Sequence, residues 1–343
     1  MKIAVASVNN GPNGSFEVIS VFTARSYCSI AKSESFSRTL STVTESNSSA
    51  SNAAESSTAQ ASTTHRVLTL VCPDKPGIVH AMTAAIVASA GNIVELQQFS
   101  SLDTDRFFMR IEVDSPVTRG ALLAEVNPVA ERFGASIHLD EVGRPIRTLV
   151  LGSTAEHCVN DLLFRQRTGH LPIEVTRLMA NHPNLANIAN FYGVPFEHLP
   201  IKGPEQKAAF ENRVREIIKE DGIELVVLAR YMQIVSPELC EELEGMAINI
   251  HHSFLPGFKG ANPYRQAHER GVKVVGATAH FVTTDLDEGP IIEQNVRRVD
   301  HTDTVKQLQA MGQDEESRTL TQAVKWFAEH RILLDGHRTI VFR

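Results

Sequence analysis

Apolar residues recur at two different spacings along the chain, and these spacings predict two folded regions. In the first region, residues 66–143, short apolar runs alternate with stretches whose apolar residues fall every three or four positions. The predicted order is strand, helix, strand, strand, helix, strand. Its elements are 66–72, a helix from Ile78, 93–100, 107–114, 119–133 and 136–142. The order βαββαβ predicts a small ferredoxin-like domain.

The second region, residues 147–343, alternates buried strands with longer amphipathic helices. The predicted strands are 148–152, 175–180, 225–229 and 247–250, and the helices between them are 157–167, 185–192 and 205–220. This alternation predicts an α/β domain, a Rossmann-like parallel sheet with helices on both faces. Ligands of such sheets bind beyond the carboxyl ends of the strands, so the search for chemistry starts there.

The first 65 residues have a different composition from the rest. Residues 33–65 are more than half Ser and Thr and nearly lack large apolar side chains, so we predict a disordered extension over 1–65. Transit peptides are also rich in Ser but poor in acids. Glu17, Glu34, Glu45 and Glu55 speak against such a peptide. Mitochondrial import therefore stays open as the alternative to a cytoplasmic location.

Charge and cysteine content narrow the function classes. The 343 residues include 33 Lys and Arg against 40 Asp and Glu, a net charge of −7, which disfavours binding to nucleic acid. No apolar run is long enough to span a membrane. The four cysteines form no CxxC pair, which indicates small buried side chains in a reducing compartment and not a zinc or disulfide framework.

The first strand-to-helix junction, residues 152–158 (GSTAEHC), lacks the glycine patterns of nucleotide-binding loops. We therefore predict neither a nicotinamide cofactor nor ATP. The residues that carry the chemistry of this domain must therefore lie elsewhere in the sequence.

Two later segments carry that chemistry. In residues 247–256 (AINIHHSFLP), strand alternation places Asn249 and His251 on one side and Ile250 in the core. An amide beside an imidazole can stabilise an oxyanion and move a proton. The following loop, 254–260, contains glycines, which predict that its backbone can change conformation over a bound ligand. In residues 278–290 (TAHFVTTDLDEGP), Asp287 lies in an acidic turn, where its carboxylate can orient a water or an imidazole.

These motifs resemble the enzymes that handle 10-formyltetrahydrofolate. The resemblance rests on Asn249-x-His251 with the SFLP sequence after it, and on His280 with Asp287 seven residues later. The PDKPGIV sequence at 73–79 resembles the ACT domain family, and an ACT-like module fused to this domain resembles formyltetrahydrofolate deformylases. Thr154 departs from the pattern, which has Lys after the first strand.

The resemblance implies hydrolysis of 10-formyltetrahydrofolate to formate and tetrahydrofolate without a cofactor, with Asn249, His251 and Asp287 as the catalytic residues. It implies folate-binding residues at Arg230, Tyr231, Met232, Gln233, Ile234, Val235 and His280. It also implies a homo-oligomer, glycine or methionine as effector at the ACT-like module, and formate supply for purine biosynthesis.

Other interpretations of the same residues stay open. A formyltransferase would pass the formyl group to an amine such as glycinamide ribonucleotide, and a regulatory protein would lack catalysis. A metal site could use His251, His252, His280 and Asp287. We predict no metal, because neighbouring histidines at a strand end face opposite ways and no further ligand cluster is present.

Overall fold

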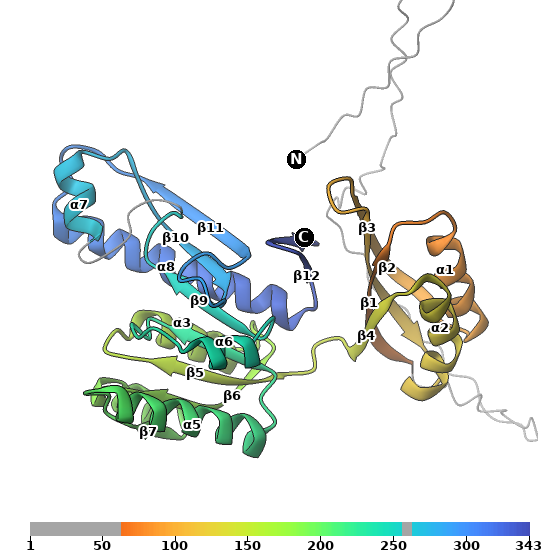
Figure 1. Cartoon of the computed structure of the whole chain (residues 1–343), viewed down its shortest axis with the longest axis horizontal. Coiled ribbons are helices and arrows are strands. Elements are labelled where there is room, and N and C mark those ends of the chain that lie inside the picture. Colours follow the sequence, from red (N-terminus) through yellow and green to blue (C-terminus); the bar gives the residue numbers. More distant parts are fainter. Residues whose placement is uncertain (1–62, 256–262) are drawn as a thin grey trace, which may run out of the picture. The chain divides into compact units, whose positions relative to one another are not determined.

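The computed structural model describes residues 63–255 and 263–343, which form an α/β protein (Figure 1). The predicted extension lies outside the described residues up to position 62, as does most of the glycine-containing loop at 254–260. In the described parts, no helix is long and apolar enough to cross a membrane.

The first domain has the predicted βαββαβ order. Its elements are β1 (Thr64–Pro73), α1 (Ile78–Ala88), β2 (Asn92–Ser101), β3 (Arg106–Ser115), α2 (Arg119–Phe133) and β4 (Ser136–Glu141). The sheet order is β2-β3-β1-β4, which is ferredoxin-like, and both helices lie on one face of it (Figure 1). Met82 of α1, Val126 of α2 and Met109 of β3 are fully buried in the core between these layers.

The second domain is built on a seven-stranded sheet of order β11-β10-β9-β8-β5-β6-β7. Its strands are β5 (Ile146–Gly152), β6 (Ile173–Ala180), β7 (Phe196–His198), β8 (Leu225–Ala229), β9 (Ala247–His251), β10 (Val274–Phe281) and β11 (Ile291–Arg298). Its helices are α3 (His157–Arg167), a short 3-10 turn (Pro183–Leu185), α4 (Ala186–Tyr192), α5 (Pro204–Asp221), α6 (Pro237–Glu242), α7 (Pro263–Arg270) and α8 (Val305–Ala328). A small hairpin of β12 (Ile332–Asp335) and β13 (Arg338–Val341) follows.

The four strands predicted to form a parallel sheet, β5, β6, β8 and β9, are parallel, and two further strands make the sheet mixed. Strands β5 to β9 are parallel, but β10 pairs antiparallel with both β9 and β11. The segment between β10 and β11 is shorter than the dozen or so residues that a parallel crossover needs, so these two strands form a hairpin. The hairpin folds the acidic turn at Asp287 back over the end of β9.

Helices cover both faces of the sheet, as predicted, because successive strand residues face opposite cores. Val150, Val227 and Ile248 belong to one buried cluster, which also contains apolar residues of α3, α4 and α8. Leu149, Leu151, Val226 and Leu228 belong to a second cluster with residues of α5 and α6. This alternation follows from the two-residue period of a strand.

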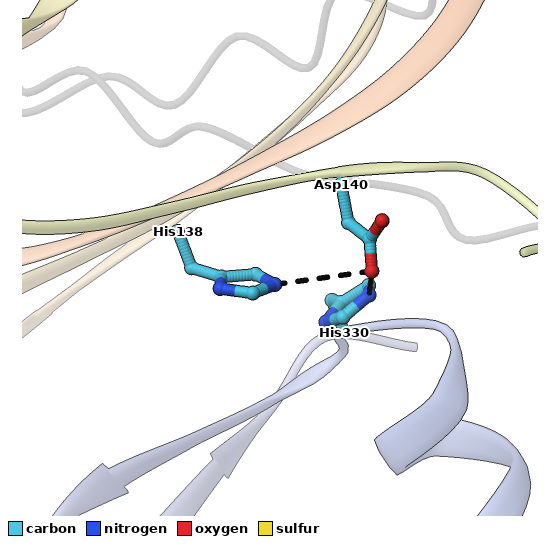
Figure 2. A group of neighbouring side chains, drawn as sticks. All are labelled: His138, Asp140 and His330. Atoms are coloured by element: carbon cyan, nitrogen blue, oxygen red, sulfur yellow. Dashed lines mark hydrogen bonds and ion pairs between the residues drawn. The ribbon is translucent and has the colours of Figure 1, made fainter. Parts of the chain in front are cut away.

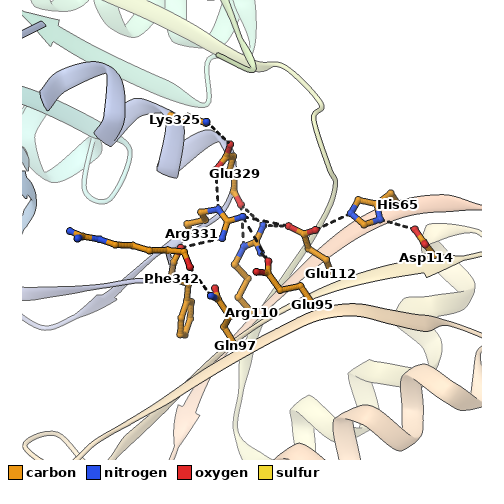
Figure 3. Close-up of polar contacts among 11 residues, drawn as sticks. His65, Glu95, Gln97, Arg110, Glu112, Asp114, Lys325, Glu329, Arg331 and Phe342 are labelled. Atoms are coloured by element: carbon orange, nitrogen blue, oxygen red, sulfur yellow. Dashed lines mark hydrogen bonds and ion pairs between the residues drawn. The ribbon is translucent and has the colours of Figure 1, made fainter. Parts of the chain in front are cut away.

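Charged side chains of the ferredoxin-like domain contact the end of α8 and the residues after it. Arg110 on β3 is only 1% exposed and donates from Nη2 to the Glu329 carbonyl oxygen over 3.0 Å. Its guanidinium also pairs with Glu95 at 2.8 Å and Glu112 at 2.6 Å (Figure 3). At a second contact, Nε2 of His330 lies 3.0 Å from Asp140 on β4 (Figure 2). The junction is therefore polar.

Candidate active site

Asn249 on β9 and His280 on β10 face each other across neighbouring strands. The strand register pairs His280 with Asn249 and Thr278 with His251, so these four side chains share one face of the sheet. Asn249 Nδ2 lies 3.2 Å from His280 Nε2. The predicted placement of Asn249 and His251 on one side agrees with this register, and Ile250 lies in the core.

His280 fixes the orientation of the Asn249 amide. Its Nδ1 lies 2.8 Å from the Phe281 carbonyl oxygen, which can only accept, so Nδ1 carries the proton. The unprotonated Nε2 then accepts a hydrogen bond from Nδ2 of Asn249. Burial lowers the pKa of His280, which favours this neutral form. One amide N–H of Asn249 is thereby held, and the second stays available.

Asp287 reaches the same site from the turn after β10. Its backbone is left-handed, with φ 59°, a conformation that Asp tolerates better than most residues. Oδ1 of the carboxylate lies 3.1 Å from His251 Nδ1 and 3.8 Å from His280 Nε2. The hydrogen bond from His251 lowers the pKa of Asp287, so its carboxylate is ionised at neutral pH. The structure thus brings Asn249, His251 and Asp287 together.

A pocket opens beside this group. It is lined by Asn249, His280 and Asp287 and by residues of the segment after β8 and of the acidic turn. The remaining lining residues are Leu228, Tyr231, Met232, Gln233, Ile234, Val235, Cys240, Val282, Thr283, Thr284 and Leu286. Met232 and Ile234 are apolar side chains that stay largely exposed, which suits a flat aromatic ligand.

The predicted folate-binding residues divide into three groups. Met232, Gln233, Ile234, Val235 and His280 line the pocket. Tyr231 also reaches it, but its ring is buried and stacks on Phe210. Arg230 does not line it; its guanidinium lies on Glu316 of α8, with Nε 3.3 Å from the carboxylate.

Glu316 is a residue that the sequence analysis missed. Its side chain is only 1% exposed and accepts hydrogen bonds from the Tyr264 hydroxyl at 2.5 Å and from His157 Nε2 at 2.8 Å. Burial alone would raise the pKa of this carboxyl, but these bonds and the charge of Arg230 hold it below its usual value. The sequence signal that could have identified Glu316 is its position among the apolar residues of the long helix α8.

The prediction that His251 and His252 face opposite ways is wrong. Their rings stack, with centroids 4.9 Å apart and 18° between the planes. Strand β9 ends at His251, so the alternation of side chains no longer applies to His252 in the following bend.

Two other groups of side chains have the composition of metal sites. His138, Asp140 and His330 form one, and His157, Cys158 and Glu316 form the other. In each group a guanidinium lies against the carboxylate, since Arg144 is 2.6 Å from Asp140 and Arg230 is 3.3 Å from Glu316. A fixed positive charge at that distance opposes a bound cation.

The arrangement around Asn249 is suited to addition at a carbonyl carbon. The free amide N–H and the imidazole can stabilise a developing oxyanion, and the carboxylate can hold and deprotonate an attacking water. All three groups lie where the strands end, the usual place for ligands in such sheets.

Comparisons with known proteins agree with this chemistry. A family described as formyl transferase matches residues 146–324. The formyltetrahydrofolate deformylase of Corynebacterium sp. (strain P-1) is 48% identical over 280 residues, which is 81% of this chain and 98% of that protein. The crystal structure of a formyltetrahydrofolate deformylase from Burkholderia mallei ATCC 23344 matches with TM-score 0.79 and 47% identity, covering 82% of this chain and 100% of that chain.

A transferase structure matches a smaller part of the chain. Glycinamide ribonucleotide transformylase 1 from Symbiobacterium toebii matches with TM-score 0.56 and 34% identity, and it covers 60% of this chain and 98% of that one. The deformylase matches therefore extend over more of this chain than this transferase match does.

Proposed function

Because this chain belongs to the formyltetrahydrofolate deformylase family, we propose that it hydrolyses 10-formyltetrahydrofolate with Asn249, His251 and Asp287 as its catalytic residues. The products are formate and tetrahydrofolate. The observation that carries the assignment of residues is the contact of Asp287 Oδ1 with His251 Nδ1 at 3.1 Å, beside an Asn249 amide oriented by His280.

The reaction follows from these positions. The oxygen of a water held by Asp287 attacks the formyl carbon, and the water passes a proton to the carboxylate. Asn249 donates its free N–H to the oxyanion, and protonated His251 adds positive charge there. The carbon–nitrogen bond then breaks, the folate nitrogen takes a proton, and formate leaves. The pocket lined by Met232 and Ile234 holds the folate ring.

Water is the proposed acceptor, in preference to an amine that carries a phosphate. A phosphate needs a cradle of free backbone N–H groups, usually glycine-rich, after the first strand of the domain. Here residues 153–158 contain no glycine, and the buried Glu316 carboxylate lies on His157 at the start of α3. Nε2 of His157 is therefore occupied by Glu316 and is not free to bind a phosphate.

The test is formate release by the purified enzyme with 10-formyltetrahydrofolate and no amine. We propose that no metal or cofactor takes part, so release continues after exhaustive chelation and does not accelerate with glycinamide ribonucleotide. Release that requires the amine would establish a formyltransferase. Release that returns only with added zinc would establish a metal site on His251, His280 and Asp287.

The ferredoxin-like domain is proposed to be an ACT module that associates into a homo-oligomer and binds glycine or methionine. Support comes from the PDKPGIV sequence and from the turn at Gly77, whose φ of 94° leads directly into α1. Light scattering measures the oligomer, and rates with each amino acid measure the effector. A monomeric protein whose rate of formate release is unchanged by glycine and by methionine would contradict this proposal.

The proposed setting is the cytoplasm, with formate supplied to purine biosynthesis. The described cysteines, Cys72, Cys158 and Cys240, are buried and form no disulfide, as is usual in a reducing compartment. Fractionation of cells that make the full chain tests the location, with mitochondria as the alternative. Relief of a purine requirement by the active gene, and not by an inactive one, tests the role.

A further inference from the structure

Four buried nitrogen atoms beside the catalytic group have no hydrogen-bond partner among the described residues. They are Arg230 Nε and Nη1, His251 Nε2 and His252 Nε2. Buried polar atoms in folded proteins are nearly always paired, with protein, water or ligand. Several such atoms on neighbouring residues therefore indicate that something polar binds there.

The two histidines lie against each other, and the charge of Arg230 acts on the pKa of His252. The rings of His251 and His252 stack 4.9 Å apart, so the two imidazoles present their edges side by side. Burial, together with the nearby charge of Arg230, lowers the pKa of His252 to about 4. His252 is consequently neutral at pH 7, whereas the Arg230 guanidinium is always charged.

Glu316 holds the guanidinium in place without using up its donors. Its carboxylate already accepts from Tyr264 and His157, and Arg230 Nε lies 3.3 Å away at an angle that makes no hydrogen bond. The Arg230 backbone is left-handed, with φ 61°, a conformation that costs energy in a residue other than glycine. Nε of Arg230 therefore faces Glu316, and Nη1 is the buried donor that remains for a ligand.

We propose that Arg230 and His252 form a subsite for the formate product, next to His251. This inference rests on the proposed function, which produces formate as an anion. One formate oxygen accepts an N–H donor from Nη1 of Arg230, and charge-assisted bonds of this kind are the strong ones. His252 donates from Nε2 when its neutral ring carries the proton there.

The subsite separates the two products. The pocket beside Asn249 is not lined by Arg230 or His252, so tetrahydrofolate and formate occupy different places. When the carbon–nitrogen bond breaks, the new carboxylate leaves the catalytic residues for the guanidinium, and the folate can dissociate on its own. The subsite accordingly predicts that formate inhibits as a product.

Product inhibition tests this subsite. The inhibition constant of sodium formate is measured at constant ionic strength for the wild type, Arg230→Met and Arg230→Lys. We expect inhibition to weaken by at least about tenfold in Arg230→Met, the effect of losing a charge-assisted hydrogen bond, and by less in Arg230→Lys. Arg215→Met is the control: it removes one positive charge, paired with Glu242 on the surface, and leaves formate inhibition unchanged.

A second variant keeps the test decisive if Arg230→Met fails to fold. His252→Phe preserves a ring that can stack on His251 but removes the donor, and it should also weaken formate inhibition. Equal inhibition of the wild type, Arg230→Lys and His252→Phe overturns the subsite. Crystals of the wild-type enzyme soaked in formate give the direct observation: formate on Arg230 and His252 supports it. Water there, or formate elsewhere as an adventitious additive only, overturns it.

These outcomes are distinct from failure of the proposed function. An enzyme that releases no formate from 10-formyltetrahydrofolate would refute the hydrolysis, whatever the soak shows. An enzyme that releases formate normally, with inhibition insensitive to Arg230 and His252, would refute the subsite alone.

Discussion

Three residues close to the pocket, Arg230, Met232 and Asp287, have left-handed backbones although none is glycine. Such conformations cost about 1–3 kcal/mol each and persist where the surrounding structure enforces them, often at functional sites. At Asp287 the conformation turns the carboxylate back onto His251. At Arg230 it accompanies a guanidinium that lies on Glu316. Two of the charged groups near this site, the Asp287 carboxylate and the Arg230 guanidinium, thus belong to residues with a strained backbone.

The most direct prediction at this scale concerns Asp287. Asp287→Asn keeps the shape of the side chain but removes the base and the negative charge beside His251. Formate release should fall by about 10²–10³, the usual cost of one catalytic contact, while folate binding measured by fluorescence persists. Asp285→Asn, an exposed carboxylate two residues away, is the matched control. More than half of the activity remaining in Asp287→Asn would remove Asp287 from the mechanism.

His252 gives a prediction about pH. Its pKa is about 4 in the fold and near 6.5 when unfolded, so the unfolded chain takes up the proton first as pH falls. His252 therefore leaves stability unchanged above the unfolded value and reduces it between about pH 6.5 and 4. Denaturant unfolding of the wild type should lose up to about 1.4 kcal/mol per pH unit more than His252→Phe in that range. Parallel curves for the two proteins would contradict this.

The three proposed catalytic residues could be selected from the sequence, but the side chains that support them could not. Asn249 and His251 could be predicted to share a side because they are two positions apart on one strand. The role of His280 as the group that orients Asn249 depends on the pairing of β9 with β10, which no local pattern specifies. The contact of Arg230 with Glu316 joins residues far apart in the chain, so it too required the fold.

Among the elements, the turn between β10 and β11 decides where Asp287 lies. It closes tightly at Gly289, where a Cβ atom would come within 1.8 Å of the Phe281 carbonyl oxygen. A backbone oxygen cannot move away as a flexible side chain can. Gly289 is therefore required by close packing, and it holds the acidic turn against the end of β10.

We expect Gly289→Ala to displace this turn and with it Asp287. Activity should fall by at least about tenfold, since a shift of about 1 Å in a catalytic group can cost that much or more, while circular dichroism stays native. Gly120→Ala is the control, because an added Cβ there meets nothing within 4 Å in helix α2. Full activity in Gly289→Ala would show that the turn adapts without moving the carboxylate.

Elements with a clear local period were predicted closely, and the others were not. The helices at 157–167 and 119–133 have the predicted bounds, because their apolar stripes are regular. The antiparallel direction of β10 was missed because strand direction depends on the length of the connection, which periodicity does not report. Helix α8 was not assigned in advance, and its buried Glu316 was therefore missed as well.

At the scale of the whole molecule, ion pairs hold the ferredoxin-like domain to the sheet domain. Arg144 contacts both Asp140 on β4 and Glu224 before β8 at 2.6 Å. Burial would raise the pKa of Asp140, but the hydrogen bond from Arg144 outweighs it and lowers that pKa to about 2. Asp140 thus stabilises the fold above its unfolded value near 3.8, and this stabilisation is lost as pH falls through about 2.

Asp140→Asn should therefore lower the free energy of unfolding at pH 7 by about 2 kcal/mol, the equivalent of that pKa difference. Chemical denaturation measures the loss, and the difference from wild type should shrink below pH 4. Asp103→Asn removes a carboxylate from an exposed pair with Arg338 and should change stability by less than about 0.5 kcal/mol. Equal effects of the two substitutions would show that the Asp140 contact adds nothing to stability.

The claim that water is the acceptor has one decisive measurement. The enzyme, with 10-formyltetrahydrofolate and no amine, is allowed to turn over once in water enriched in oxygen-18, and the formate is analysed by mass spectrometry. Attack by water at the formyl carbon predicts one labelled oxygen in each formate molecule, in stoichiometric amount with tetrahydrofolate. No formate without an added amine, or formate whose oxygens carry no label, would contradict hydrolysis at Asn249, His251 and Asp287.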